Sequence, residues 1–414
     1  MKTGLPGIPR DLCLRCKGYR NLCGLGYCPL LRGFRGKVKM ISRINDTRVD
    51  GATPPSALVG EYGYPYVNVY IGLPPSVHGD EAKKYDDPSS WFLRLGLGDI
   101  IELRSQLMYA KKKAKVNDPW MLYEEEIGLA ALSRKPVDAE AELSSIPRPK
   151  LRLDPLLPPI GPTISARRIR VAGNPSLHPV LEKLIWDDVK AEEAVWILHR
   201  EGLDHYEIVR ALSLGFIGRI KRRKLVPTRW SITAIDSILA KMYLKTIHLS
   251  RPISDILVYH AEYLYNKYTI ILYPGRYSSE WIEVWMPNSL WNPHAEPSML
   301  IIRDDYGGRP EKMDGGFLAA RTPILEHLAR IRKQAKIIIL REVAPQYIYP
   351  VGNWQIRMTV AEALSRGPVL RNPPKKDLLL YLRRTHNVPV HIYDRIIKNV
   401  YNYKQMILDD FRKQ

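Results

Sequence analysis

Four cysteines near the start of the chain are the residues best suited to chemistry. Cys13 and Cys16 form a C-x2-C pair, and Cys23 and Cys28 follow as a C-x4-C pair. Four thiolates complete the tetrahedral shell of a structural zinc ion and leave no open position for a substrate. The head, residues 1–36, is too short to build a core, so zinc would supply its folding energy. An iron–sulfur cluster or four unbound thiols are the alternatives.

A second short pattern lies in the last residues, where Gln405, Leu408 and Phe411 are spaced by three. This spacing places Leu408 and Phe411 on one side of a helical turn, as an apolar plug for a shallow pocket on a partner. The glutamine adds a directional hydrogen bond. Because the segment 401–414 lies at the C-terminal end of the chain, it can separate from its domain and bind a partner. The alternative is an ordinary amphipathic terminal helix, because apolar residues upstream continue a similar stripe.

A basic run lies in the middle of the chain, after two predicted helices. Residues 190–200 form the first helix, and Asp204 with Glu207 forms a capping box that opens the second. Lysine and arginine neutralise phosphates whatever the nucleic-acid sequence, so the run indicates contact with a polyanion. A solvated basic face is the alternative. The candidate residues are Arg219, Lys221, Arg222, Arg223, Lys224, Arg229 and Trp230.

Acidic and aromatic residues gather between positions 280 and 314, among them Glu280, Glu283, Asp304 and Trp281. Paired carboxylates hold divalent metals in phosphodiester chemistry, and exposed tryptophans stack on bases. The alternative is structural, because Trp281 and Trp285 share one face of a predicted strand. The sequence therefore leaves catalysis open and identifies no catalytic residue.

The overall composition narrows the class of partner. The 414 residues contain 63 Lys and Arg against 43 Asp and Glu, a net charge of +20, which favours DNA, RNA or an anionic membrane as a partner. No run of eighteen apolar residues occurs, so no membrane-spanning segment is expected. The N-terminus lacks the apolar stretch of a secretory signal. We therefore expect an intracellular, cytoplasmic protein.

The order of the patterns predicts an α+β fold. A four-cysteine zinc module precedes a mixed α/β body, with an antiparallel or mixed sheet in the C-terminal half. The expected domains are the head at 1–36, an N-terminal α+β domain at 37–143, a proline-rich linker at 144–163, a C-terminal α+β domain at 164–400 and the tail at 401–414. Strands are expected over 255–265, 268–273, 281–285, 299–303 and 336–340, and a helix over 322–334.

Taken together, these features resemble the archaeal Nre family, and among it the NreA-type members. The resemblance rests on the four cysteines, on Leu225–Ala234 followed by Asp236, on Gly315–Arg321, and on the tail. It implies DNA damage repair and binding to PCNA, the sliding clamp, through a C-terminal PCNA-interacting peptide. Gln405, Leu408 and Phe411 match that peptide, whereas Arg412 stands where its second aromatic usually lies.

The expected protein is a DNA-repair factor with a structural Zn²⁺, a DNA-binding body and a clamp-docking tail, associated with the nucleoid in the cytoplasm. Two alternatives from other classes stay open. One is a nuclease or other enzyme that acts on damaged DNA with an acidic site near residues 280–314. The other is an RNA-binding or ribosome-associated zinc protein, for which charge and cysteines would look the same.

Overall fold

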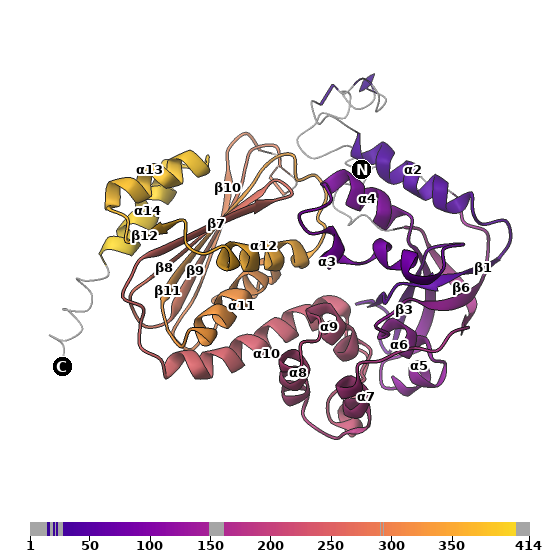
Figure 1. Cartoon of the computed structure of the whole chain (residues 1–414). Helices are drawn as coiled ribbons and strands as arrows, with labels where there is room; N and C mark the ends of the chain where they lie inside the picture. Colours follow the sequence, from indigo (N-terminus) through magenta and orange to yellow (C-terminus); the bar gives the residue numbers. More distant parts are fainter. Residues whose placement is uncertain are drawn as a thin grey trace. The chain divides into compact units, whose positions relative to one another are not determined.

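A computed structural model describes residues 15–16, 20, 22–23, 28–148, 161–289, 291–292 and 294–402. The chain divides into two compact units, with the boundary between Leu239 and Ala240 inside helix α10 (Thr228–His248). We call the described residues from Cys16 to Leu239 the N-terminal unit and those from Ala240 onward the C-terminal unit (Figure 1). Each unit is built around one six-stranded sheet.

The sheet of the N-terminal unit has the strand order β1-β5-β6-β4-β3-β2. All neighbouring strands pair antiparallel except β4 and β6, which run parallel, so the sheet is mixed. The strands are β1 (Arg48–Thr53), β2 (Ala57–Val59), β3 (Tyr66–Leu73), β4 (Met108–Lys115), β5 (Val137–Leu143) and β6 (Thr163–Val171).

Helices cover this sheet on both sides, with α2 and α4 on one side and α5 and α6 on the other (Figure 1). The face under α4 buries Ala52 and Tyr109 at one end and is exposed at Lys113 and Lys115 at the other. The helices are α2 (Pro29–Ile41), η1 (Gly79–Tyr85), α3 (Pro88–Trp91), α4 (Leu97–Ser105), α5 (Trp120–Glu124), α6 (Ile127–Ala131), α7 (Pro179–Trp186), α8 (Ala191–Arg200), α9 (His205–Ser213) and η2 (Ile220–Arg222).

The sheet of the C-terminal unit is also mixed, in the order β10-β9-β11-β8-β7-β12, with only the β9–β11 pair parallel. Helices α13 and α14 cover one face, where Ile282, Ile338 and Ile392 pack together, and α11 and α12 cover the other (Figure 1). The elements are β7 (Leu257–Tyr263), β8 (Asn266–Tyr273), β9 (Ser278–Trp285), β10 (Ser298–Asp304), α11 (Gly315–Arg330), β11 (Lys336–Val343), α12 (Asn353–Ser365), β12 (Leu370–Arg371), α13 (Lys375–Thr385) and α14 (Val390–Tyr401).

The α+β class and the mixed sheet of the C-terminal half are as the sequence predicted. The boundary between the two compact units lies inside α10. Strand β6, which follows the proline-rich segment in the chain, pairs with β5 and β4 of the N-terminal sheet. The domain bounds expected from the sequence stay a prediction, and residues 149–160 of that segment lie outside the described residues.

The described part of the chain holds no helix that is both long and apolar enough to cross a membrane.

Candidate nucleic-acid interface

The predicted basic run forms one exposed turn after α9. Its residues 219–224, here called the basic segment, contain η2, and the side chains of Arg219, Lys221, Arg222 and Lys224 are exposed. The amide of Ile220 donates a hydrogen bond of 2.7 Å to the carboxylate of Asp188, which holds the turn against the residues after α7. Four cations are therefore presented to solvent from a backbone that is fixed at its start.

Arg223 lies in the interior and takes another role than phosphate contact. Its side chain is only 7% exposed, and its guanidinium donates to the carbonyl oxygens of Gly218 at 2.8 Å and Asp187 at 2.7 Å. It also donates to Leu184 and Ile185, in the last turn of α7. The Leu184 carbonyl also accepts from the amide of Asp187 at the end of the helix, and Arg223 adds a charged donor to these carbonyls, so it caps the C-terminus of α7. Burial lowers the pKa of Arg223, while Asp188 and Asp187 raise it.

The end of the basic segment is tied to the sheet. The amide of Leu225 donates to the carbonyl of Val116 at 2.8 Å, and the amide of Val116 donates to Pro65 at 2.9 Å. These bonds place Lys224 beside the ends of β3 and β4, where the exposed Lys115 stands opposite the exposed Tyr66 in the strand register. Neither residue is a candidate from the sequence alone, because their pairing depends on strand register.

The start of α10 joins the same surface. Thr228 accepts a hydrogen bond of 2.8 Å from the amide of Val59, which anchors the helix to β2. The next two residues, Arg229 and Trp230, are exposed, and the Arg229 guanidinium lies 3.8 Å from Glu61. Tyr62 follows Glu61 in the loop between β2 and β3 and is 82% exposed. Basic and aromatic side chains therefore gather at one end of the N-terminal unit.

This surface, here called the basic–aromatic surface, has the chemistry of a nucleic-acid interface. Lysine and arginine neutralise phosphates, and exposed aromatic rings stack on bases. Its described members are Tyr62, Tyr64, Tyr66, Lys113, Lys115, Arg219, Lys221, Arg222, Lys224, Arg229 and Trp230. Six of the seven nucleic-acid candidates predicted from the sequence are among them, and Arg223 supports them from within.

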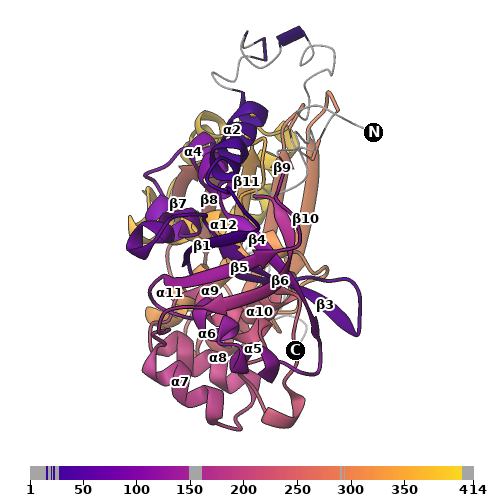
Figure 2. The ribbon, with the colours of Figure 1, turned by 90° about the vertical axis from the view of Figure 1, so that its right-hand side faces the viewer.

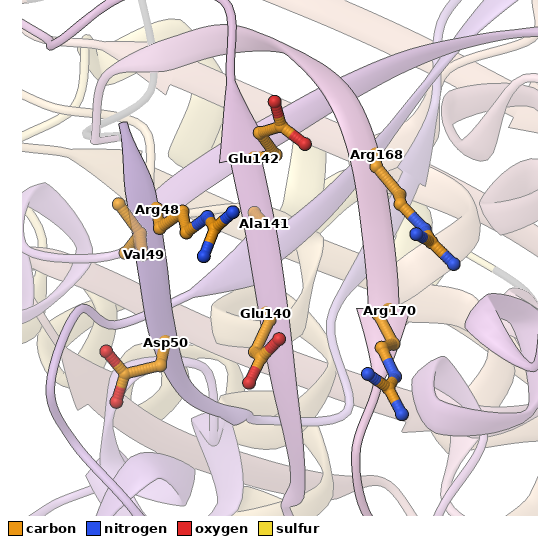
Figure 3. A pocket seen from close by; sticks show the side chains of 8 residues that line it. All are labelled: Arg48, Val49, Asp50, Glu140, Ala141, Glu142, Arg168 and Arg170. Carbon is orange, nitrogen blue, oxygen red and sulfur yellow. The ribbon is translucent and has the colours of Figure 1, made fainter. Parts of the chain in front are cut away.

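A second arginine-rich surface on the outer face of β1, β5 and β6 is less suited to phosphates. Figure 3 shows Arg48, Arg168 and Arg170 around a hollow that Asp50, Glu140 and Glu142 also line. The strand register pairs Glu142 with Arg48 on one side and with Arg168 on the other. Three carboxylates thus balance three guanidinium groups, and cross-strand charge pairing explains the pattern.

Three carboxylates of the predicted acidic region, those of Glu280, Glu283 and Asp304, are buried and paired with cations. Asp304 accepts hydrogen bonds from the Tyr277 hydroxyl at 2.6 Å and the Ser279 amide at 2.9 Å, and it forms an ion pair with Arg321. Glu283 pairs with Arg341. Burial raises the pKa of Tyr277, and the Asp304 carboxylate raises it further.

Glu280, on the opposite face of β9, pairs with Arg395 of α14 and accepts a hydrogen bond of 2.8 Å from Asn399. Trp281 and Trp285 are buried and share one face of β9, as the structural interpretation expects. These carboxylates therefore hold the core of the C-terminal unit together. Across the residues that the structure describes, no group of three His, Cys, Asp or Glu side chains is arranged to hold a metal.

The predicted zinc ligands lie at the edge of the described residues. Cys16 is buried, Cys23 and Cys28 are half-buried, and Cys28 precedes the first residue of α2, where its carbonyl accepts from the Arg32 amide at 3.0 Å. Cys13 lies outside the described residues. Thiols with restricted solvent access suit a zinc site in their chemistry, and zinc at the four cysteines stays a prediction.

The predicted clamp-binding residues Gln405, Leu408 and Phe411 also lie outside the described residues. Helix α14 ends at Tyr401, and its apolar residues Ile396, Ile397 and Val400 are buried in the core against the sheet. The apolar stripe upstream of the tail is therefore explained by packing of α14 in the core of the C-terminal unit.

Comparison with known families covers nearly the whole chain. Residues 22–292 match the family described as archaeal Nre, N-terminal, and residues 304–411 match archaeal Nre, C-terminal. The chain belongs to the archaeal Nre family. This Nre chain is 35% identical to the DNA repair protein NreA of Archaeoglobus fulgidus over 91% of its own length and 94% of that protein.

Two further relatives are similar. The DNA repair protein NreB of the same organism is 32% identical, over 91% of the Nre chain and 94% of the relative. The DNA repair protein NreA of Haloferax volcanii is 34% identical, over 76% of the Nre chain and 77% of the relative. No solved structure matches the chain.

Proposed function

We propose that this Nre chain acts in DNA repair by binding DNA through the basic–aromatic surface and docking on a sliding clamp through its last residues. The family supports the repair role, since two relatives that match this chain over 94% of their own length are named DNA repair proteins. The single observation that carries the DNA contact is the exposure of Arg219, Lys221, Arg222 and Lys224 on one anchored turn.

The DNA contact is tested by removing three charges from the basic segment. The variant Lys221→Ala/Arg222→Ala/Lys224→Ala should bind a labelled oligonucleotide at least about tenfold more weakly in fluorescence anisotropy, because each lost phosphate contact reduces counterion release. A matched control, Lys375→Ala/Lys376→Ala/Arg384→Ala, removes three exposed charges from the C-terminal unit and should bind like the unmodified chain. An equal loss of DNA affinity in the two variants would show that the effect comes from net charge and not from contacts of the basic segment.

The same assay distinguishes DNA from RNA. An unlabelled RNA of identical sequence is added as competitor to the DNA complex. The proposal expects DNA to compete at least as well as RNA. RNA that displaces the DNA at much lower concentration would favour the RNA-binding alternative instead.

The clamp contact is proposed from the spacing of Gln405, Leu408 and Phe411 and from the family resemblance. Burying two such apolar side chains contributes about 1.5–3 kcal/mol each, which suits a transient complex. Phe411→Ala should abolish capture of the chain by immobilised clamp, and Arg412→Phe should strengthen it by restoring a second aromatic. Clamp capture that survives Phe411→Ala would remove the tail from the proposal.

A structural zinc ion held by Cys13, Cys16, Cys23 and Cys28 completes the proposal. Its role would be to fold the head, since four thiolate ligands leave no position for a reacting group. DNA and the clamp as partners would place the chain at the nucleoid, in the cytoplasm.

A further inference from the structure

An exposed stack of aromatic rings lies next to the basic segment. Trp186, the last residue of α7, is 61% exposed, yet its ring is stacked on Trp120 of α5 with centroids 5.6 Å apart and planes 25° apart. Tyr123 contacts both indoles edge-on, at 5.5 Å from Trp120 and 5.3 Å from Trp186. Both helices lie at the same end of the N-terminal unit (Figure 2).

The stack is held rigidly from behind. Tyr123 also contacts the buried Phe216 edge-on at 6.0 Å, so the cluster is continuous with the core. The Arg223 guanidinium lies over the Trp120 ring at 5.7 Å and binds the carbonyls of Ile185 and Asp187, the two neighbours of Trp186 in the chain. A large exposed ring in a fixed position loses little conformational entropy when it binds a partner.

Cations lie close to the stack on one side. The Ile220 amide donates a hydrogen bond of 2.7 Å to the carboxylate of Asp188, which follows Trp186 by two residues in the chain, so the basic segment begins in contact with the residues next to Trp186. Arg219, Lys221 and Arg222 extend from there. Asp187 and Asp188 follow Trp186 in the chain, and both carboxylates are engaged locally: Asp188 accepts from the Ile220 amide, and Asp187 accepts from the Asp188 amide at 2.8 Å.

From this arrangement we infer that the Trp186–Trp120 stack is a platform for an unpaired DNA base, whose flanking phosphates contact Arg219, Lys221 and Arg222. One face of Trp186 lies on Trp120, and a base would stack on its exposed side. Bases within a duplex already stack on each other, so the platform selects single strands, flaps and gaps. This inference rests on the proposed DNA binding and names its substrate class as DNA with unpaired bases.

The test compares one variant on two DNA forms. Trp186→Ala should weaken binding to a single-stranded oligonucleotide by about 5- to 100-fold, the range that loss of one stacked base produces. Binding to a blunt duplex of the same sequence should be unchanged. Trp186→Phe keeps a ring and should recover most of the single-strand affinity. Trp291→Ala removes an equally large exposed indole from the C-terminal unit and should change neither affinity.

Abasic oligonucleotides give a second readout that folding defects would not produce. Replacing the bases of the single strand by abasic sites should weaken binding of the unmodified chain and should barely affect Trp186→Ala, which has already lost the stacking contact. A Trp186→Ala variant that binds single strands normally, or that loses single-strand and duplex affinity equally, overturns the platform. If the basic-segment variant alone lost binding to both single-stranded and duplex DNA, the proposed DNA binding would stand without the platform. An unmodified chain that binds neither form of DNA overturns both the platform and the proposed DNA binding.

Discussion

The guanidinium of Arg223 lies 5.7 Å from the centre of the Trp120 ring and binds four backbone carbonyls around the end of α7. Its sequence neighbour Arg222 is exposed to solvent. Two adjacent arginines of one basic run therefore have different tasks, since one builds the surface and the other is presented on it.

Arg223→Ala should destabilise the N-terminal unit by about 2–4 kcal/mol, because buried carbonyls lose a charged donor. Arg223→Lys should recover little of this stability, since an ammonium cannot reach several carbonyls with the fork geometry of a guanidinium. Chemical unfolding measures both variants, with Arg222→Ala as the matched control that should unfold like the unmodified chain. Equal stability of the Arg222 and Arg223 variants would mean that the cap contributes nothing.

Asp304 should be a structural residue of the C-terminal unit. Asp304→Ala leaves the buried Arg321 without its carboxylate and should cost about 3–5 kcal/mol of unfolding free energy. Asp305→Ala removes the neighbouring carboxylate, whose contact is the exposed amide of Gly307, and should cost much less. If Asp304→Ala instead kept full stability and abolished cleavage of damaged DNA, the result would favour the alternative of an enzyme with an acidic site near residues 280–314.

The stability of the C-terminal unit should fall below neutral pH through His260. Burial, together with the neighbouring His386, lowers the pKa of His260 to about 4. The folded chain thus keeps this imidazole neutral while the unfolded chain protonates it below pH 6.5, so stability is present above pH 6.5 and is lost as pH falls toward 4. The loss is about 3 kcal/mol at roughly 1.36 kcal/mol per pH unit, reduced to about 2 by partial solvent exposure. His260→Gln should flatten this part of the stability profile measured by urea unfolding.

The head should contain one zinc ion per chain, with Zn–S distances of about 2.3 Å. Elemental analysis and X-ray absorption measure the metal and its ligands. Cys16→Ser should release the zinc while the main melting transition stays in place, because the clusters that pack against the two sheets are built from residues downstream of the head. Iron in the purified chain, or no metal at all, would contradict this prediction.

The sequence predicts elements well where periodicity is strong and local. The strands expected at 268–273, 281–285 and 299–303 correspond to β8, β9 and β10, and the capping box at Asp204 opens α9, where its carboxylate accepts from the Tyr206 amide at 2.8 Å. The helix expected to begin at residue 322 begins earlier, at Gly315. The pair Gly315-Gly316 suggests a turn, but Asp314 accepts a hydrogen bond of 2.8 Å from the Phe317 amide and starts the helix there.

The candidate site was predictable only in its charges. Exposed lysines and arginines appear in the sequence as a run, whereas the burial of Arg223 depends on carbonyls of residues 184–187, far upstream. The stack of Trp120 on Trp186 joins residues that no local pattern connects. Strand register and tertiary packing create these relationships, so a periodicity argument on one sequence does not reach them.

The salt dependence of DNA binding tests the central claim most directly. For a duplex, the slope of log affinity against log salt falls by about 0.9 for each phosphate contact that is lost. Lys221→Ala/Arg222→Ala/Lys224→Ala should therefore reduce the slope by up to about 2.7, whereas Lys375→Ala/Lys376→Ala/Arg384→Ala should leave it unchanged. Equal slopes for the unmodified chain and the basic-segment variant would show that these side chains contact no phosphate, and would contradict the proposed interface.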